Sequence, residues 1–316
     1  MPSSDSDRWH PGQILAFLGI GAVLYLALLF WSERLAMANG ARNPFFQIER
    51  AAQQQDWIIL GASHAMPLAF DGAEAQIEAA TGQTILNLAA TGSGPFVWRL
   101  VAERYFRDHA AANVLIVADG FAFRDRRWNQ DRIGDSDFLP RVPWDIATLR
   151  VMAAAVPRGL RPTTLANYAT GFSKIGNPDR FKPDIWETEA RFDLSPRPSA
   201  ASDKARVAYL YPGPPDPAAE AAYFNDLGAL ADLARRNGAR VTVIRPPLPD
   251  RFRALLPDDA AFAARLSAFA AAQGVGYADM AGVLPEPRFY LDPDHLNRAG
   301  VEAWLNAELG ALLRDR

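Results

Sequence analysis

The chain has 316 residues, of which 49% are hydrophobic, and a formal net charge of −3 at neutral pH. A chain of this length can bury a sizeable core, and its slight negative charge argues against a nucleic-acid-binding surface, so no nucleic-acid partner is expected. It contains no cysteine, which excludes disulfides, thiolate metal sites and a cysteine nucleophile.

An uncharged apolar run extends from Ile14 to Trp31 near the N-terminus. As a helix, about 18 residues span roughly 27 Å, close to the hydrocarbon thickness of a bilayer. Tyr25 and Trp31 are suited to the membrane interface, and charged residues follow directly. We therefore predict a transmembrane helix over residues 13–32.

This helix would separate a cytoplasmic tip (residues 1–12) from a connector (33–56) and a main domain (57–316). A cleaved signal peptide is the alternative, because Ala36-Met37-Ala38 resembles a small-residue cleavage site. The charges on the two sides of the helix differ too little to set its orientation. The expected cytoplasmic N-terminus therefore rests only on what is common among single-span proteins. Both interpretations place the main domain outside the cytoplasm.

A short apolar run, Trp57–Leu60, ends at Gly61 and is followed by Ser63. Such a run is typical of a buried strand in a parallel sheet. Apolar residues then recur at helical spacing, so Ser63 is expected in the turn between the strand and a helix. Unpaired N–H groups at a helix N-terminus stabilise an anion, which suits a nucleophile. A glycine two residues before a serine is also a common turn without any catalytic role.

Strand and helix patterns alternate through most of the remaining chain, which predicts an α/β fold with a mostly parallel sheet. The predicted strands are Thr84–Ala89, Asn113–Ala118, Arg240–Ile244 and Val275–Asp279, with an extended segment at Val207–Tyr211. The predicted helices cover residues 96–109, 217–237, 258–272 and a C-terminal stretch that begins at Asn297.

The alternation is lost between residue 121 and about residue 205, which predicts a large insert. Inserts of this kind serve as functional lids or docking elements, although a solvated helical excursion fits the pattern equally well. Its first residues, Phe121–Trp128, are rich in aromatic residues and arginine and include Arg124. They follow the carboxyl end of a strand, where open α/β sheets bind ligands, so we expect them to face a ligand.

Near the C-terminus, Asp292 precedes His295 by three residues, directly before the helix that Asn297 can cap. A carboxylate at this spacing can accept a hydrogen bond from one ring nitrogen and leave the other free to take a serine proton. Asp294 is a competing partner, but the spacing favours Asp292. The alternative is an Asx-type turn with an incidental histidine.

Together, the serine after the first strand, the glycine loop after the second and the Asp-x-x-His motif before the last helix resemble the SGNH (GDSL-like) hydrolase family. The resemblance covers residues 57–316, with the insert at about 121–205. It implies a flavodoxin-like, three-layer α/β fold and a serine esterase or acyltransferase without metal or cofactor. Carried over, it makes Ser63 the nucleophile, His295 the base and Asp292 its orienting partner, and Ser63 and Gly92 supply oxyanion-binding N–H groups.

Two blocks depart from the family pattern. The first reads Gly61-Ala62-Ser63, where the family usually has Gly-Asp-Ser. The third has Asp119 where an asparagine usually supplies an oxyanion donor, and a carboxylate cannot donate. Loss of one such donor costs on the order of 10²–10³ in rate. Candidate replacements are Asn87, Arg124 and Asn129, and His64 either contacts substrate or packs beside the sheet.

A single span joined to an SGNH-like domain looks like the acyl-transfer partners of bacterial envelope polymers. These include alginate O-acetylation proteins, the teichoic-acid D-alanylation protein and SGNH-like members of cellulose-secretion operons. The resemblance implies an acyl donor or polysaccharide substrate and an inner-membrane location with the domain on the periplasmic or extracellular side. Its expected partner is a multi-span O-acyltransferase or a polysaccharide synthase complex. The alternatives are a non-catalytic scaffold that binds polysaccharide and a plain membrane-bound lipase or esterase.

Overall fold

The computed structural model describes residues 10–39, 42–182 and 189–315. In this part of the chain, five parallel strands form a sheet in the order β2-β1-β3-β4-β5. Their bounds are Gln54–Gly61 (β1), Ile85–Asn87 (β2), Ala110–Val117 (β3), Arg240–Arg245 (β4) and Gly276–Asp279 (β5). This is the strand order of flavodoxin-like folds, so the predicted α/β fold with a parallel sheet is confirmed. The predicted cytoplasmic tip, residues 1–12, falls mostly outside the described residues.

Successive side chains of the strands point to opposite faces of the sheet. Ile58 of β1 and its partner Val114 of β3 lie in one buried cluster, whereas Ile59 and Leu115 lie in a second cluster on the other face. Because both faces are covered, these strands consist of continuous apolar runs rather than alternating ones.

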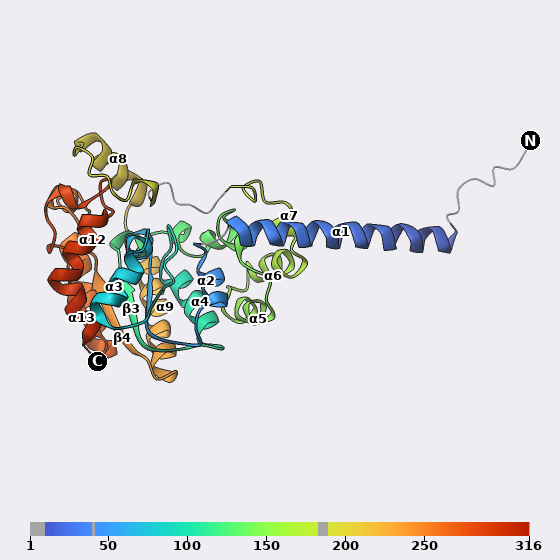
Figure 1. The fold of residues 1–316 in the computed structure, drawn as a ribbon, viewed down its shortest axis with the longest axis horizontal. Helices are drawn as coiled ribbons and strands as arrows, with labels where there is room; N and C mark the ends of the chain where they lie inside the picture. The colour runs from blue at the N-terminus through green and yellow to red at the C-terminus, as the bar shows by residue number, and fades with distance from the viewer. Residues whose placement is uncertain (1–9, 40–41, 183–188, 316) are drawn as a thin grey trace, which may run out of the picture.

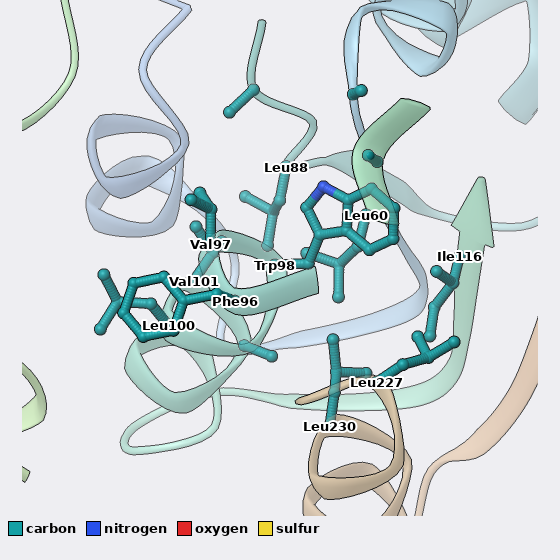
Figure 2. Close-up of a cluster of buried hydrophobic side chains, with 14 of the residues drawn as sticks. Leu60, Leu88, Phe96, Val97, Trp98, Leu100, Val101, Ile116, Leu227 and Leu230 are labelled. Carbon is teal, nitrogen blue, oxygen red and sulfur yellow. The ribbon is translucent and has the colours of Figure 1, made fainter. Parts of the chain in front are cut away.

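The first face is covered by α4 (Pro95–Tyr105), α9 (Pro217–Arg236) and α11 (Asp259–Gln273). Figure 2 shows Trp98 of α4 next to Leu60 of the sheet. Ile116 of the sheet and the two leucines of α9, Leu227 and Leu230, belong to the same cluster. Trp98 is 1% exposed, so its truncation to alanine would cost about 3–5 kcal/mol. This packing fixes the strand ends on which the site is built.

The second face is covered by α3 (Ala73–Thr81), α12 (Arg298–Trp304), a π-helical turn (Leu305–Leu309) and α13 (Gly310–Arg314). Trp304 is fully buried there, and the indole N–H of Trp57 donates to the carbonyl of Leu313 over 3.0 Å. Asn297 caps α12, because its side chain accepts a bond from the N–H of Gly300, as the sequence predicts.

The N-terminal helix α1 (Pro11–Asn39) projects from the body of the molecule (Figure 1). It is the one described helix that is long and apolar enough to cross a membrane, and its most apolar stretch is 0% buried. It extends beyond the predicted span of 13–32 at both ends. Within the predicted connector, α2 (Pro44–Arg50) packs Phe45 and Ile48 into the core.

The insert consists mainly of helices and divides between two places. Its longer elements are α5 (Ile146–Ala155), α6 (Arg161–Thr170), α7 (Phe172–Ile175) and α8 (Ala200–Leu210). Short 3₁₀ turns occupy much of residues 120–141 and residues 189–191. In Figure 1, α5, α6 and α7 gather around the base of α1, whereas α8 lies at the opposite end of the molecule, near α12.

One prediction for this region is wrong. The segment Val207–Tyr211 is not extended, because α8 continues to Leu210. Ser199 caps this helix, and the alanines at its start favour helix formation. Because extending a formed helix costs less than starting one, the helix includes the few β-favouring residues at its end. The aromatic rings expected to face a ligand are buried, with Phe121 2%, Phe123 0% and Trp128 5% exposed, and Phe121 lies edge to face with His64, with ring centroids 6.2 Å apart.

Candidate active site

Ser63 lies where the sequence predicts, directly after β1 at the carboxyl edge of the sheet. It begins a 3₁₀ helix, Ser63–Ala69, rather than the predicted α-helix. The turn needs a glycine before it, since a Cβ on Gly61 would lie 3.0 Å from the Cβ atoms of both Ala65 and Val117. Ser63 itself is 3% exposed, so its hydroxyl is held among neighbouring side chains.

The loop before α12 brings His295 to this serine, 232 positions away in the chain. The Nε2 atom of His295 lies 3.0 Å from the Oγ atom of Ser63. Its Nδ1 atom lies 2.8 Å from Oδ2 and 3.0 Å from Oδ1 of Asp292. Asp292 also accepts a bond from the backbone N–H of His295, which fixes the loop. The three predicted residues therefore form a continuous Ser-His-Asp path.

The glycine loop after β2 borders the same turn. The N–H of Ala90 and the hydroxyl of Ser93 each donate to the carbonyl of Gly61 over 3.1 Å. Gly92 has a positive φ of 57°, and a Cβ there would lie 3.1 Å from the Trp128 ring. The loop therefore needs glycine at this position, and its neighbours Ala90 and Ser93 tie the loop to the start of the serine turn.

His64 joins the site from the position after the serine. Its Nδ1 atom lies 2.6 Å from Asp119 Oδ1, and its Nε2 atom lies 3.0 Å from Asp294 Oδ2. Burial alone would lower the pKa of His64, but the charges and hydrogen bonds of the two carboxylates outweigh it and raise the pKa to about 10. At neutral pH, His64 is therefore a cation between two carboxylates.

This arrangement accounts for the unusual third block. Asp119 is buried, 5% exposed, and its carboxylate faces the His64 ring. An asparagine there would give His64 a neutral partner instead of an anionic one. Asp119 of the third block and His64, which directly follows the first block, thus form a buried pair beside Ser63.

Arg206 of α8 covers the site and was not predicted from the sequence. Its Nε atom donates to Asp294 Oδ2 over 2.9 Å, and its Nη2 atom lies 3.2 Å from His295 Nε2. Burial alone would lower the pKa of Arg206, but the charge of Asp294 outweighs it and raises the pKa. The guanidinium thus meets the same ring nitrogen that faces the hydroxyl of Ser63.

Asp294 is the centre of this network rather than the primary partner of His295. Its Oδ1 atom lies 3.3 Å from His295 Nδ1, against 2.8 Å for Asp292. Burial alone would raise the pKa of Asp294, but the charges of His295 and Arg206 and the hydrogen bond from His64 hold it far below its usual range. The nearer carboxylate is therefore Asp292, as its spacing predicts.

The charges around the nucleophile nearly balance. Three carboxylates, those of Asp119, Asp292 and Asp294, face two cations, Arg206 and the imidazolium of His64. If His295 takes a proton from Ser63, the resulting imidazolium faces the carboxylate of Asp292 across its Nδ1 atom.

One described group of side chains has the composition of a metal site. The donor atoms of His64, Asp294 and His295 lie within 4.8 Å of one another. A metal ligand must be a neutral imidazole, whereas the two ring nitrogens of His64 each face a carboxylate, and Arg206 already pairs with Asp294. These residues fit an ion-pair network better than a metal ion.

The remaining predicted residues are held elsewhere. Asn87 donates to the carbonyl of Ala65 and accepts from the N–H of Ala89. Arg124 pairs with Asp258 over 3.0 Å. Asn129 bonds backbone groups of the insert and of α4. The structure does not bring these three side chains to Ser63, so their roles as oxyanion donors gain no support from it.

Comparison with known proteins adds little to this geometry. No family model and no curated protein matches the chain. Among solved structures, the chain resembles a crystal structure from Bacteroides fragilis described as a "putative acylhydrolase", with 10% identity and a TM-score of 0.42. The alignment covers 82% of this chain and 86% of that one. At this identity and score the similarity says nothing about chemistry, which has to come from the side chains themselves.

Proposed function

We propose that the chain is a serine acyl-transfer enzyme of the SGNH type that carries an acyl group on Ser63. The observation that supports this most is the hydrogen-bonded path from Ser63 through His295 to Asp292. Such a path is the general arrangement for activating a serine hydroxyl, whatever the fold.

In the first half-reaction, His295 Nε2 takes the proton of Ser63 as Oγ attacks the carbonyl carbon of an ester. The negative charge that develops on the carbonyl oxygen is met by backbone N–H groups of the Ser63 turn and the Gly92 loop. The imidazolium then gives its proton to the leaving alcohol as the ester bond breaks. Asp292 holds the ring in the tautomer that presents Nε2 to the serine.

In the second half-reaction, a hydroxyl group resolves the acyl-serine. His295 takes the proton of the incoming hydroxyl, the new ester bond forms and the bond to Ser63 Oγ breaks, which returns the proton to the serine. Water as the acceptor gives an esterase, and a sugar hydroxyl gives an O-acyltransferase. We propose a polysaccharide or other glycopolymer of the cell envelope as the acceptor or substrate.

The surroundings of the triad fit a polar ligand. A hollow beside Asp292 is lined by Arg191, Arg197, Ser199 and Ser202. Hydroxyl and guanidinium groups bind sugar hydroxyls and carboxylates well, whereas an acyl-chain site would be lined mainly by apolar side chains. The polar groups of this hollow favour a glycopolymer there. A second hollow, beside His64 and Asp119, is lined mainly by apolar side chains such as Leu210 and Phe252 and suits an acyl group.

We further propose that α1 anchors the domain in the cytoplasmic membrane, with the domain on the periplasmic side and a multi-span acyltransferase or synthase as its partner. Anchoring would raise the effective concentration of enzyme and donor at one surface. The cysteine-free chain allows a simple test of sidedness. A single cysteine at exposed Ala311 should react with a membrane-impermeant maleimide in intact spheroplasts, and protection until lysis would contradict this orientation.

The catalytic proposal is tested by labelling purified, full-length protein with a fluorophosphonate probe. We expect labelling of the wild type, its loss in Ser63→Ala and a strong reduction in His295→Ala. Ser173→Ala, a serine of α7 whose hydroxyl bonds Asn167, is the matched control and should label normally. Labelling that persists in Ser63→Ala would show that another residue reacts.

A second candidate is a non-catalytic scaffold that binds polysaccharide. The observation in its favour is that the triad is covered, with Ser63 3% and His295 1% exposed beneath Arg206 of α8. This candidate predicts no labelling of the wild type at any pH, while polysaccharide binding persists in Ser63→Ala. Labelling of Ser63 would rule it out.

A further inference from the structure

The apolar stretch of α1 has almost no partner within the described chain. Its large side chains are widely exposed, for example Leu15 at 71%, Phe17 at 69% and Leu24 at 60%. Burial begins only near the C-terminal end, where Ser32 and Ala36 are covered. The exposed stretch therefore needs an apolar environment, and its C-terminal end meets protein.

The protein that it meets is the basal part of the insert, residues 139–182. The hydroxyl of Tyr25 donates to the carbonyl of Thr170 over 2.6 Å. Leu29 packs against Gly171, whose φ of 69° and lack of a Cβ allow the close approach. These contacts join α1 to the loop between α6 and α7.

Contacts continue toward the C-terminal end of α1. Trp31 meets Phe181 edge to face, with ring centroids 5.7 Å apart. Glu33 forms an ion pair with Lys174 and accepts a bond from the backbone N–H of Trp144 over 2.7 Å. Side-chain packing and a partly buried ion pair thus fix α1 to the insert, so α1 is not a flexible tether.

The level of these contacts along α1 places the insert relative to a bilayer. The apolar run ends at Trp31, yet Thr170 touches Tyr25, six residues earlier. At about 1.5 Å per residue, this contact lies roughly 9 Å inside the end of the run. If the run sits in a membrane, the junction at Gly171, which packs against Leu29 only two residues from the end of the run, lies just below the boundary between headgroups and acyl chains.

The composition of the basal part suits that depth. Its exposed large side chains include Phe172 at 62%, Phe181 at 55%, Trp144 at 48% and Ile146 at 49%. It also carries seven lysine and arginine residues and two aspartates, a net charge of +5 in a chain whose total is −3, and all of these cations except Arg141 and Lys174 are at least partly exposed. Exposed aromatic rings with surrounding cations are typical of surfaces that lie on anionic lipid.

We propose that the basal part of the insert is a membrane-contact surface that rests in the interfacial region of one leaflet beside α1. This inference rests on the proposed anchor and adds a second contact to it. A single helix leaves a domain free to swing, whereas a helix with a fixed interfacial platform sets the height and tilt of the sheet. The triad is then held in one orientation to the membrane surface.

Single-cysteine variants of the full-length, cysteine-free chain test this proposal. Phe172→Cys and Phe181→Cys report on the platform, Leu24→Cys on α1, and Ala311→Cys on α13, at the opposite end of the molecule (Figure 1). Each is labelled with a polarity-sensitive fluorophore in phosphatidylethanolamine–phosphatidylglycerol vesicles. Some of the lipids carry a nitroxide quencher, either near the headgroup or near the end of the acyl chain.

We expect labels at 172 and 181 to show blue-shifted emission and to lose fluorescence mainly to the shallow quencher. The label at 24 should lose it mainly to the deep quencher, and the label at 311 to neither. Quenching of the label at 24 without quenching at 172 and 181 would contradict the membrane-contact surface but leave α1 as a membrane anchor. Absence of quenching at 24 overturns the anchor and the platform together. The second platform position keeps the test valid if one variant fails to fold.

Discussion

Two histidines lie side by side at the carboxyl edge of the sheet, with ring centroids 4.8 Å apart, but their surroundings differ. His295, in the loop before α12, has Asp292 on one ring nitrogen and the hydroxyl of Ser63 on the other. His64, in the turn after β1, has a carboxylate on each nitrogen. The first ring can pass a proton to a reacting group, whereas the second is held as a cation.

In both histidines, Nδ1 faces a carboxylate. The comparison shows that the partner of the other ring nitrogen, Nε2, decides what a buried histidine can do. A hydroxyl partner makes His295 a candidate base. A carboxylate partner, Asp294, makes His64 a fixed positive charge that offsets the acidic residues of the site. Substitutions at the two histidines and their partners should therefore have effects of very different size and kind.

The largest effect is expected for His295→Ala. Without the base, kcat for ester cleavage should fall by roughly 10⁴–10⁶, as for members of other serine triads. The double variant with Ser63→Ala should be no slower than either single variant, because the two residues act as one unit. Steady-state kinetics on an activated ester measure this, and additive losses would show that the residues act independently.

Next in size is Asp292→Asn, which keeps the shape of the side chain but removes the charge that orients His295. We expect kcat to fall by roughly 10³–10⁴. Asp294→Asn is the matched comparison, and its loss should be at least tenfold smaller because its carboxylate lies farther from Nδ1. A larger loss in Asp294→Asn would make Asp294 the orienting residue, and thermal melts of both variants control for folding.

His64→Gln should lower kcat by only about tenfold, since it removes one balancing charge, worth about 1.4 kcal/mol, but no proton-transfer group. Its clearer signature is on stability. The pKa of His64 is raised from 6.5 to about 10 on folding, so the stability it contributes is fully present below pH 6.5. That stability is lost as the pH rises toward 10.

The free energy of unfolding of the wild type should therefore fall between pH 7 and pH 10 by an amount on the order of a few kcal/mol. Urea titrations across this range measure it, with His64→Gln as the comparison. The variant should show a flatter pH dependence even though it is less stable at pH 7. An unchanged slope would mean that His64 is not charged in the folded protein.

The smallest effect, and the only increase, is expected for Arg206→Gln. In the covered site, the guanidinium competes with Ser63 for Nε2 of His295, so its removal should speed fluorophosphonate labelling by about threefold to tenfold. Arg206→Lys, which keeps the charge near Asp294, should stay close to the wild type. Slower labelling in Arg206→Gln would instead make the arginine part of the reactive arrangement.

Local patterns in the sequence predicted the strands, the long helices and the three triad residues. Ser63 follows a strand, and Asp292 and His295 precede a capped helix, so each carries its own local signal. Arg206 carries none. It lies 88 positions from Asp294, and only the fold of the insert brings the two together.

The same dependence on contacts between distant parts of the chain explains the other differences between prediction and structure. His64 and Asp119 are each ordinary at their positions, and only the neighbouring ends of β1 and β3 make them partners. The aromatic residues of the insert resemble a ligand-facing loop by composition, but composition cannot separate a surface aromatic from a core one. The capping serine at 199 and the alanines after it were the signal that could have identified α8.

The central claim is that Ser63 carries the acyl group, and the most direct test is to find that group on it. Full-length protein is mixed with p-nitrophenyl acetate, quenched in acid within the burst phase, digested and examined by peptide mass spectrometry. The structure predicts one acetyl group on the peptide that contains Ser63, absent in Ser63→Ala and accumulating more slowly in His295→Ala. No acetylated peptide, or an acetyl group that remains in Ser63→Ala, would contradict the account.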